Sequence, residues 1–266
     1  MKATRMVWSG LTGRTGFEAI KAAQDMVDVD IVMGLSRRDM SGIININGEK
    51  FEGVNWAKYE TGMSGLYGLI ELTKQAEIDA IVDFSHPDVF DKVLELAIRT
   101  GKPLISGTSG LSNRQMASLY DATNRIPIFR GGNFRFKVKK FIDEVVAAVC
   151  EHEGRIDLYE AFYKGKSLPS ETSAVLKKRV LDVTNRVVQV HSTDNYAAGN
   201  LICDWEVQIR QQISPTEIDQ HKVHCRTIGF DELAHDVLEI AKVMTRKPVR
   251  PGKFYDLDEI WDDLMS

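Results

Sequence analysis

The chain has 266 residues, 43% of them hydrophobic and 27% charged, with a formal net charge of −4 at pH 7. A chain of this length buries a sizeable core and folds as one or two domains. Its negative charge argues against nucleic acid as a main partner, and no apolar stretch approaches the ~20 residues that span a bilayer. We therefore expect a globular protein with neither a nucleic-acid nor a membrane partner.

The three cysteines, Cys150, Cys203 and Cys225, have no metal-ligand spacing. We expect no metal site, and we expect these thiols to be packed or partly exposed in a reducing compartment. The first residues run directly into an apolar strand pattern, which leaves no room for a signal peptide. Both observations predict a cytoplasmic protein.

The first informative segment is GLTGRTG at residues 10–16. An apolar run at 6–8 predicts a buried strand before it, and helical apolar spacing begins after it at Phe17. Gly10, Gly13 and Gly16 let the backbone turn tightly and approach a pyrophosphate at the free amides of the helix N-terminus. We predict a dinucleotide-binding turn, the alternative being a glycine-rich structural turn.

Strands and helices then alternate. Strand patterns fall at 30–35, 78–84, 103–106 and 126–129, and helix patterns at 87–100 and 111–124. Such alternation indicates a parallel sheet covered on both faces, with ligands at the carboxyl ends of the strands. The turns that follow strands, at 10–16, 36–38, 84–87, 107–110 and 130–134, are therefore the expected functional segments.

The pattern changes after residue 135. A helix at 136–150 precedes strands at 156–162, 187–191, 205–211 and 218–227, interrupted by a helix at 173–185. The last forty or so residues look mostly helical, with Trp261 and Leu264 as expected core residues. The sequence thus predicts an α/β fold: an N-terminal Rossmann-type parallel-sheet domain and an α+β domain whose open mixed sheet could pair with other subunits.

Four tracts carry a family resemblance: GLTGRTG at 10–16, DFSHP at 83–87, GTSG at 107–110 and GGNF at 131–134. In this order and spacing they resemble the dihydrodipicolinate reductases of lysine biosynthesis, whose Pro-Ser-Gly-Thr substrate loop is similar to PSET at 169–172. The resemblance implies a dinucleotide-binding domain at 1–130 completed by a helix at 245–266. It also implies a substrate-binding and oligomerisation domain at 131–244 that forms a homotetramer through its sheet.

Carried over residue by residue, the resemblance assigns a cofactor site to the ends of the parallel strands. The tracts follow predicted strands, where the crevice of an open α/β sheet lies. Asp83 is open to a reading as a helix cap, and His86 is more typical of a turn than of a catalytic acid. The expected cofactor-binding residues are Gly10, Leu11, Thr12, Gly13, Arg14, Thr15, Phe84, Ser85, Gly107, Thr108, Ser109, Gly131, Gly132, Asn133 and Phe134.

The end of the second strand suggests which cofactor is used. An NAD site usually has Asp or Glu there, whereas a 2′-phosphate favours Arg. Here Ser36, Arg37 and Arg38 precede Asp39, so a hydroxyl and a guanidinium fork are available to a phosphate. We expect NADP(H) to be preferred and NAD(H) to remain possible. The alternative is a solvated charged turn with Asp39.

The substrate end departs from the family pattern of Glu-x-His-His followed three residues on by Lys. Counting forward from Glu160, Phe162 and Tyr163 replace the histidines and Lys166 takes the lysine position. Counting backward from the PSET loop, that position falls on residue 165, between Lys164 and Lys166. Either lysine could be a proton donor or could bind a substrate carboxylate. We expect Phe162 to pack, and Tyr163 either to pack or to act as a second proton donor.

Two further departures concern charge. Ser170 and Thr172 sit at an expected helix N-terminus suited to a carboxylate, but Glu171 replaces the family's glycine. That glutamate either competes with a substrate carboxylate, binds a substrate ammonium, or only stabilises the helix. After the hinge, Arg135, Lys137 and Lys139 either draw in an anionic substrate or form the solvated face of a helix.

Three functions compete at this stage. The first is an NADPH-dependent reductase, or dehydrogenase in reverse, acting at the C=N or C–N carbon of a small amino-acid-like substrate, with Lys166 as the expected proton source. The second is a true 4-hydroxy-tetrahydrodipicolinate reductase with an altered proton donor. The third is a non-catalytic NADP(H)-binding homologue.

Overall fold

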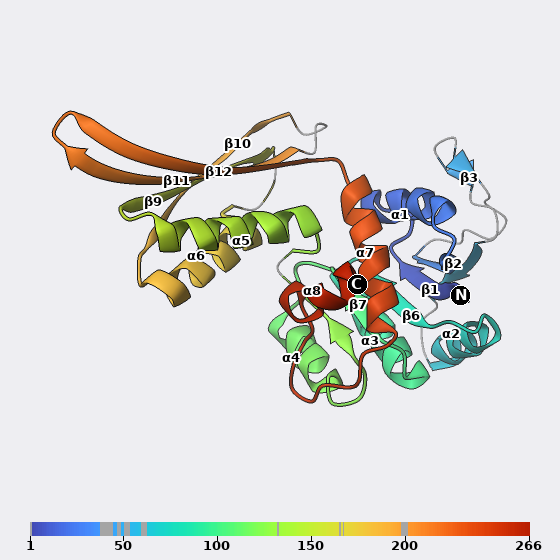
Figure 1. Cartoon of the computed structure of the whole chain (residues 1–266). Helices are drawn as coiled ribbons and strands as arrows, with labels where there is room; N and C mark the ends of the chain where they lie inside the picture. Colours follow the sequence, from blue (N-terminus) through green and yellow to red (C-terminus); the bar gives the residue numbers. More distant parts are fainter. Residues whose placement is uncertain are drawn as a thin grey trace. The chain divides into compact units, whose positions relative to one another are not determined.

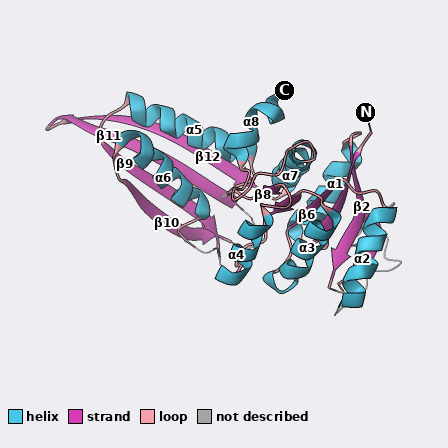
Figure 2. Cartoon of the chain, turned by 90° about the horizontal axis from the view of Figure 1, so that it is seen from below, coloured by secondary structure: helices cyan, strands magenta, loops and turns pink. Residues whose placement is uncertain are grey.

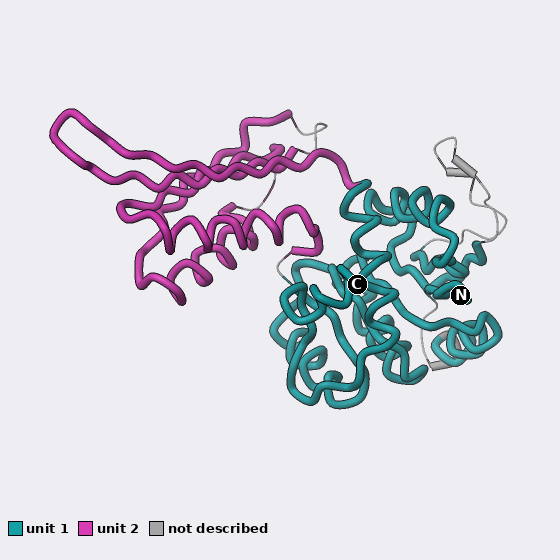
Figure 3. Tube along the Cα trace, viewed as in Figure 1, with its two compact units in different colours: residues 1–131, 231–266 teal, residues 132–230 magenta. Residues whose placement is uncertain are grey.

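The computed structural model describes residues 2–37, 45–46, 49–50, 54–59, 63–131, 133–164, 166, 168–197 and 202–266. The chain forms two compact units (Figure 3). The first contains Met1–Gly131 and Asp231–Ser266, and the second contains Gly132–Phe230.

The first unit is built on six parallel strands in the order β5-β2-β1-β6-β7-β8. Strands β2, β1, β6 and β7 are labelled in Figure 1. This strand order confirms the predicted Rossmann-type architecture. Its elements are β1 (Thr4–Ser9), α1 (Arg14–Asp25), β2 (Val29–Ser36), β3 (Asn45–Ile46), β4 (Glu49–Lys50), β5 (Asn55–Lys58), α2 (Met63–Gln75), β6 (Ala80–Asp83), α3 (Pro87–Thr100), β7 (Leu104–Ser106), α4 (Asn113–Ala122), β8 (Ile128–Phe129), α7 (Asp231–Met244) and α8 (Leu257–Met265).

The strands at the centre of this sheet are buried on both faces. Every residue of β6 and β7 is buried, which is why they appear in the sequence as continuous apolar runs rather than as alternating patterns. Helices α1 and α7 pack against each other, and α3 packs between α2 and α4. The carboxyl ends of the strands therefore meet along one edge of a rigid sheet.

Helix α3 has the same bounds as the sequence prediction because its end signals are local. His86 is the N-cap and its Nδ1 accepts a hydrogen bond from the Asp88 amide at 3.2 Å. Pro87 occupies the first helical position, where its missing N–H has no cost. Gly101 ends the helix in the left-handed conformation, with φ +67°.

Two expectations about the C-terminal segment need correction. Helix α7, expected in the second domain, belongs to the first unit because it packs against α1, β6 and β7. In α8 the buried residues are Leu257 and Ile260, whereas Trp261 and Leu264 are only half-buried. The helical phase, not residue size, decides which side chains face the core.

The second unit is a four-stranded mixed sheet covered by two helices (Figure 2). Its order is β10-β9-β11-β12, with β10 parallel to β9 and the other neighbours antiparallel. Its apolar core lies between this sheet and the two helices. The elements are α5 (Phe136–Glu151), β9 (Arg155–Tyr163), α6 (Glu171–Thr184), β10 (Val188–Tyr196), β11 (Ile202–Ser214) and β12 (Glu217–Ile228).

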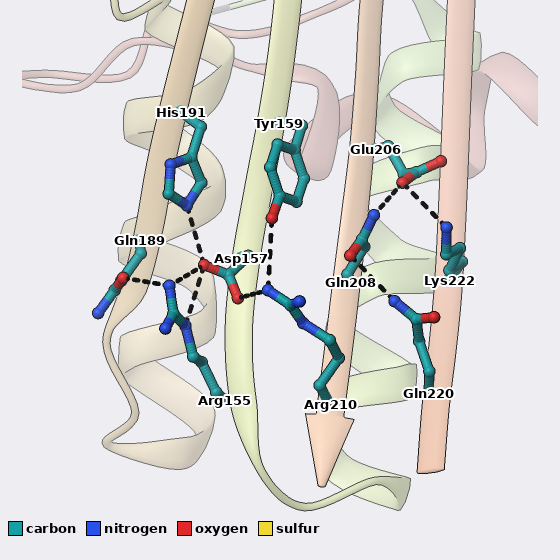
Figure 4. Close-up of polar contacts among 10 residues, drawn as sticks. All are labelled: Arg155, Asp157, Tyr159, Gln189, His191, Glu206, Gln208, Arg210, Gln220 and Lys222. Carbon is teal, nitrogen blue, oxygen red and sulfur yellow. Dashed lines mark hydrogen bonds and ion pairs between the residues drawn. The ribbon is translucent and has the colours of Figure 1, made fainter. Parts of the chain in front are cut away.

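The other face of this sheet carries a polar network (Figure 4). Asp157 on β9 accepts hydrogen bonds from Arg155 at 2.7 Å and from Arg210 at 2.7 Å, and His191 lies 2.9 Å away. Charged and aromatic side chains on adjacent strands form cross-strand pairs of this kind.

Within the described ranges, no helix is long and apolar enough to cross a membrane. The three cysteines are free thiols.

Candidate functional site

The turn between β1 and α1 requires glycine for steric reasons. Gly10 has φ +82°, and a Cβ there would collide with the carbonyl of Phe84. A Cβ on Gly16 would lie 2.5 Å from the Leu11 Cα, so α1 approaches the turn more closely than any side chain allows. Gly13 is the N-cap of α1 and forms no side-chain cap. A helix that begins without a side-chain cap suits an anion at its N-terminus.

The predicted tracts in this unit occupy the carboxyl edge of the sheet. The side chain of Leu11 is completely buried, so only its backbone can serve a ligand. Thr12 and Ser109 are exposed, whereas Thr108 is 2% exposed. The edge thus offers mainly backbone groups together with a few small hydroxyls.

A chain of hydrogen bonds lies beneath this edge, centred on the buried carboxylate of Asp83. Its Oδ1 accepts from Ser9 Oγ at 2.8 Å and from Ser85 Oγ at 2.5 Å, and its Oδ2 accepts from Thr108 Oγ1 at 2.7 Å. Tyr59, just after β5, donates its hydroxyl to Ser9 Oγ. These bonds join the ends of β5, β1, β6 and β7, so they hold the candidate cofactor turns in one arrangement.

Burial has the largest effect on the pKa values of Asp83 and Tyr59 in this chain of hydrogen bonds. It raises the pKa of Asp83, against the opposing effect of the hydroxyl donors. Burial also raises the pKa of Tyr59, so that side chain remains a donor. Asp83 does not cap a helix, which is one interpretation of the sequence, because its oxygens accept from Ser9, Ser85 and Thr108. The N-cap of the following helix, α3, is His86. In the sequence, Ser9 and Asp83 are marked only by being polar residues at the ends of apolar strands. No sequence pattern marks Tyr59 as part of the site.

Aromatic packing shapes the same edge. The ring of Phe84 stacks on Trp8 with centroids 5.8 Å apart and an interplanar angle of 25°. A Cβ on Gly107 would collide with the Phe84 ring. Gly107 is therefore required for close packing, whatever ligand its backbone meets.

The end of β2 carries part of the predicted phosphate site. Ser36 is 7% exposed. Arg37 is exposed, and its Nη1 lies 3.7 Å from Asp88 Oδ2 at the start of α3. An exposed pair of this kind contributes little stability, so Arg37 is available to a ligand. Arg38, with Asp39, lies outside the described residues.

The hinge tract is divided between the two units: Gly131 closes the first, while Asn133 and Phe134 belong to the second. Gly132 lies outside the described residues. Asn133 links two segments of the second unit. Its Nδ2 donates to Thr172 Oγ1 at 2.9 Å, and its Oδ1 accepts from the Arg135 amide at 2.8 Å.

Glu160 organises the predicted substrate loop. This carboxylate is 2% exposed and accepts from the Ser170 amide at 3.0 Å, from Ser170 Oγ at 2.7 Å and from Ser192 Oγ at 2.6 Å. Ser173 Oγ also donates to it. Ser170 caps α6 through the Ser173 amide. The Ser170 hydroxyl is thus engaged inside the fold, and a ligand would meet the other first-turn groups of α6.

The residues in the family's histidine positions have separate surroundings. Phe162 is 1% exposed and packs edge-on against Trp205 with centroids 5.4 Å apart, which confirms the packing role expected for it. Tyr163 is half-buried at the end of β9, and Lys164 and Lys166 are exposed just beyond it. The Lys166 amide donates to the Tyr163 carbonyl at 3.3 Å. Glu171 is exposed in the first turn of α6.

The basic residues after the hinge differ in their surroundings. Lys137 is exposed, as a solvated helix face requires. The side chain of Lys139 is only 12% exposed and pairs with Asp143 on the same helix, so the solvated face expected for it does not extend to Lys139. Arg135 is 6% exposed and does not belong to that face. Among the residues that the structure describes, no group of three His, Cys, Asp or Glu is placed to hold a metal.

Comparison with known proteins places this geometry in a family. Residues 4–134 match the family described as "Dihydrodipicolinate reductase, N-terminus". A 4-hydroxy-tetrahydrodipicolinate reductase from Xanthomonas campestris pv. campestris is 31% identical over 186 residues, which cover 69% of this chain and 74% of that protein. One from Thermomicrobium roseum is 30% identical, and the alignment covers 66% of this chain and 65% of the relative's own length.

A similar fold occurs in the dipicolinate-bound dihydrodipicolinate reductase from Paenisporosarcina sp. TG-14, with a TM-score of 0.69 at 13% identity, covering 97% of this chain and 99% of the other. The WlbA (WbpB) dehydrogenase from Thermus thermophilus, solved with NAD and UDP-GlcNAcA, has a TM-score of 0.54 at 13% identity, covering 93% and 96%. Together, the sequence relatives and the glycine turn at the sheet edge show that this chain belongs to the dihydrodipicolinate reductase family.

Proposed function

We propose that this protein is a nicotinamide-dependent oxidoreductase that prefers NADPH and reduces the C=N carbon of a small amino-acid-like substrate, or oxidises the corresponding amine. The observation that carries the proposal is the turn after β1. Its Gly10 position excludes a Cβ, and the helix that follows begins without a side-chain cap. Such a backbone cradle fits a pyrophosphate.

NADPH is preferred in this proposal because of the groups after β2. Ser36 ends the strand and Arg37 follows it with a side chain that is exposed. A guanidinium binds a 2′-phosphate through charge-assisted hydrogen bonds that NADH does not offer. The test compares kcat/KM for the two cofactors, where Arg37→Ala should lower the NADPH value and leave the NADH value nearly unchanged. A clear NADH preference in the wild type contradicts the assignment.

The proposed chemistry divides between cofactor and protein. A bound reduced nicotinamide supplies the hydride that the imine carbon accepts. The imine nitrogen then needs a proton, and Lys166 is the proposed donor, with Tyr163 second. Thr172 would hold the substrate by a hydrogen bond, with Lys164 and the first-turn amide of Glu171 beside it. Orientation of the two reactants supplies much of the rate.

The assay is a panel of cyclic and acyclic imines and amines, measured in both directions with each cofactor. Lys166→Ala should lower kcat by roughly 10²–10⁴-fold, the usual contribution of a general acid, and Tyr163→Phe should lower it less. Lys177→Ala, an exposed lysine of α6, is the matched control. Wild-type rates in both the Lys166 and Tyr163 variants remove these two assignments.

A second candidate is a true 4-hydroxy-tetrahydrodipicolinate reductase, because the relatives named above carry that name. Turnover of the cyclic dihydrodipicolinate imine, at a rate above the rest of the panel, selects it. The replacement of the histidine pair by Phe162 and Tyr163 favours the first candidate.

We also propose that the protein is a cytoplasmic homotetramer assembled through the mixed sheet of its second unit. Support comes from the family resemblance and from the sheet face opposite α5 and α6, which no described helix of the second unit covers (Figure 1). Light scattering coupled to gel filtration tests this directly, and a monomer at micromolar concentration refutes it.

A further inference from the structure

Arg135 occupies an unusual position in the second unit. It is the N-cap residue of α5, and its amide is held by Asn133 Oδ1 at 2.8 Å. Its Nη2 donates to the Gly229 carbonyl at 2.6 Å, beyond the end of β12. Because only 6% of the residue is exposed, the guanidinium lies inside the unit rather than in solvent.

No described residue forms an ion pair with this guanidinium. Within the described part of the chain, its Nη1 is buried without a hydrogen-bond partner. The buried carboxylate of Glu160 is already engaged by Ser170, Ser173 and Ser192. An arginine remains charged under all ordinary conditions, and a buried charge without a partner is costly.

The surroundings of Arg135 connect it to the proposed substrate site. Asn133 bonds both to the Arg135 amide and, at 2.9 Å, to Thr172 in the first turn of α6. Burial raises the pKa of the Cys203 thiol, and the positive charges of Arg135 and Lys166 oppose that effect.

We infer that the Arg135 guanidinium binds a carboxylate of the substrate and that it sets specificity for carboxylate-bearing imines or amines. This inference rests on the proposed function. Phe162 and Tyr163 replace the two histidines of the family pattern. The inference therefore gives the anion-binding role to Arg135. A guanidinium forms short, directional hydrogen bonds to a carboxylate, and its buried site excludes the water that would weaken them.

The experiment measures binding of pyridine-2,6-dicarboxylate and of its uncharged diamide to the full chain by calorimetry. Arg135→Met keeps the bulk of the side chain and removes the charge, and Arg135→Lys keeps the charge and removes the fork. Arg186→Met is the matched control, because Arg186 also donates to backbone carbonyls, those of His152 and Gly154, beyond the other end of α5.

The dissociation constant of the dicarboxylate should rise roughly 10- to 100-fold in Arg135→Met, as expected for loss of a hydrogen bond to a charged group. It should rise less in Arg135→Lys and stay within about twofold in Arg186→Met. The diamide should bind all variants equally weakly. Equal dicarboxylate affinity in wild type and Arg135→Met overturns the inference, as does a wild type that binds neither compound or prefers the diamide.

Separate titration with NADPH distinguishes the two proposals. NADPH affinity should be the same in wild type and Arg135→Met, because the dinucleotide cradle lies in the other unit. A wild type that binds no dinucleotide refutes the proposed function, whatever the dicarboxylate does. If Arg135→Met does not fold, as judged by its melting temperature, the Arg135→Lys variant decides: an unchanged dicarboxylate affinity there overturns the role of the fork.

Discussion

Replacing Asp157 by asparagine should remove a pH-dependent part of the stability of the second unit. Asp157 has a completely buried side chain, surrounded by Arg155, His191 and Arg210 (Figure 4). Burial alone would raise the pKa of Asp157, but the hydrogen bonds from these three residues outweigh it and hold the pKa well below its usual range. Folding therefore favours the ionised form of the Asp157 side chain over its protonated form.

The size of the effect follows from the exposure of the partners. A hydrogen bond to a charged group contributes ~1.5–3 kcal/mol, but Arg155 and Arg210 have side chains 55% and 35% exposed, which screens each pair. The carboxamide oxygen of the variant would still accept a hydrogen bond. We expect Asp157→Asn to lower the free energy of unfolding by about 1–2 kcal/mol at pH 7.

The sign of the pH dependence is fixed by the direction of the shift. A lowered folded-state pKa stabilises the protein above the unfolded pKa of ~3.9, and this contribution is lost as the pH falls below it. The difference between wild type and variant in urea denaturation should therefore shrink between pH 6 and pH 3. The control is Asp219→Asn, because Asp219 is exposed on strand β12. A gap that is absent at pH 7, or that widens toward acid, refutes the reasoning.

Three further changes test the edge of the parallel sheet. Gly10→Ala should lower the free energy of unfolding by about 1–3 kcal/mol and weaken NADPH binding. The control is Gly68→Ala, where a Cβ meets nothing, and it should stabilise the protein by about 0.5–1 kcal/mol. Equal melting temperatures of the two variants contradict this prediction. Asp83→Ala should destabilise more than Asp83→Asn, because Ala leaves three hydroxyls without an acceptor; the reverse order in urea denaturation would be inconsistent with the hydrogen-bond chain. Tyr59→Phe should lower stability by about 1 kcal/mol, measured the same way, and no change would mean that its bond to Ser9 is not formed in solution.

Much of the fold could be predicted because its signals lie close together in the sequence. Helix α3 has a proline at its first position and a glycine after its last, so both ends are encoded within the segment itself. The central strands are apolar throughout, which indicates burial on both faces. Strand β5 and helix α2 were not predicted, because the short alternation at 55–58 carries no signal strong enough to separate it from a loop.

The candidate site divides in the same way. Part of the glycine turn is encoded locally, since Gly16 lies against the backbone of Leu11, within the same turn. The Cβ that is excluded at Gly10 would instead meet Phe84, which only the pairing of β1 with β6 brings near. Asp83 was open to a reading as a cap, but its partners Ser9 and Thr108 lie 74 and 25 residues away. Only the pairing of β1, β6 and β7 brings those hydroxyls to it.

The sequence by itself determined the class of the fold, the dinucleotide turn and the order of the motifs, because periodicity and glycine placement act over one or two turns of chain. Tertiary structure decided that Arg135 leaves the solvated helix face expected for its neighbours and lies buried beside Gly229, and that α7 returns to the first unit. Burial and charge pairing depend on contacts between distant segments. No local pattern of residues contains that information.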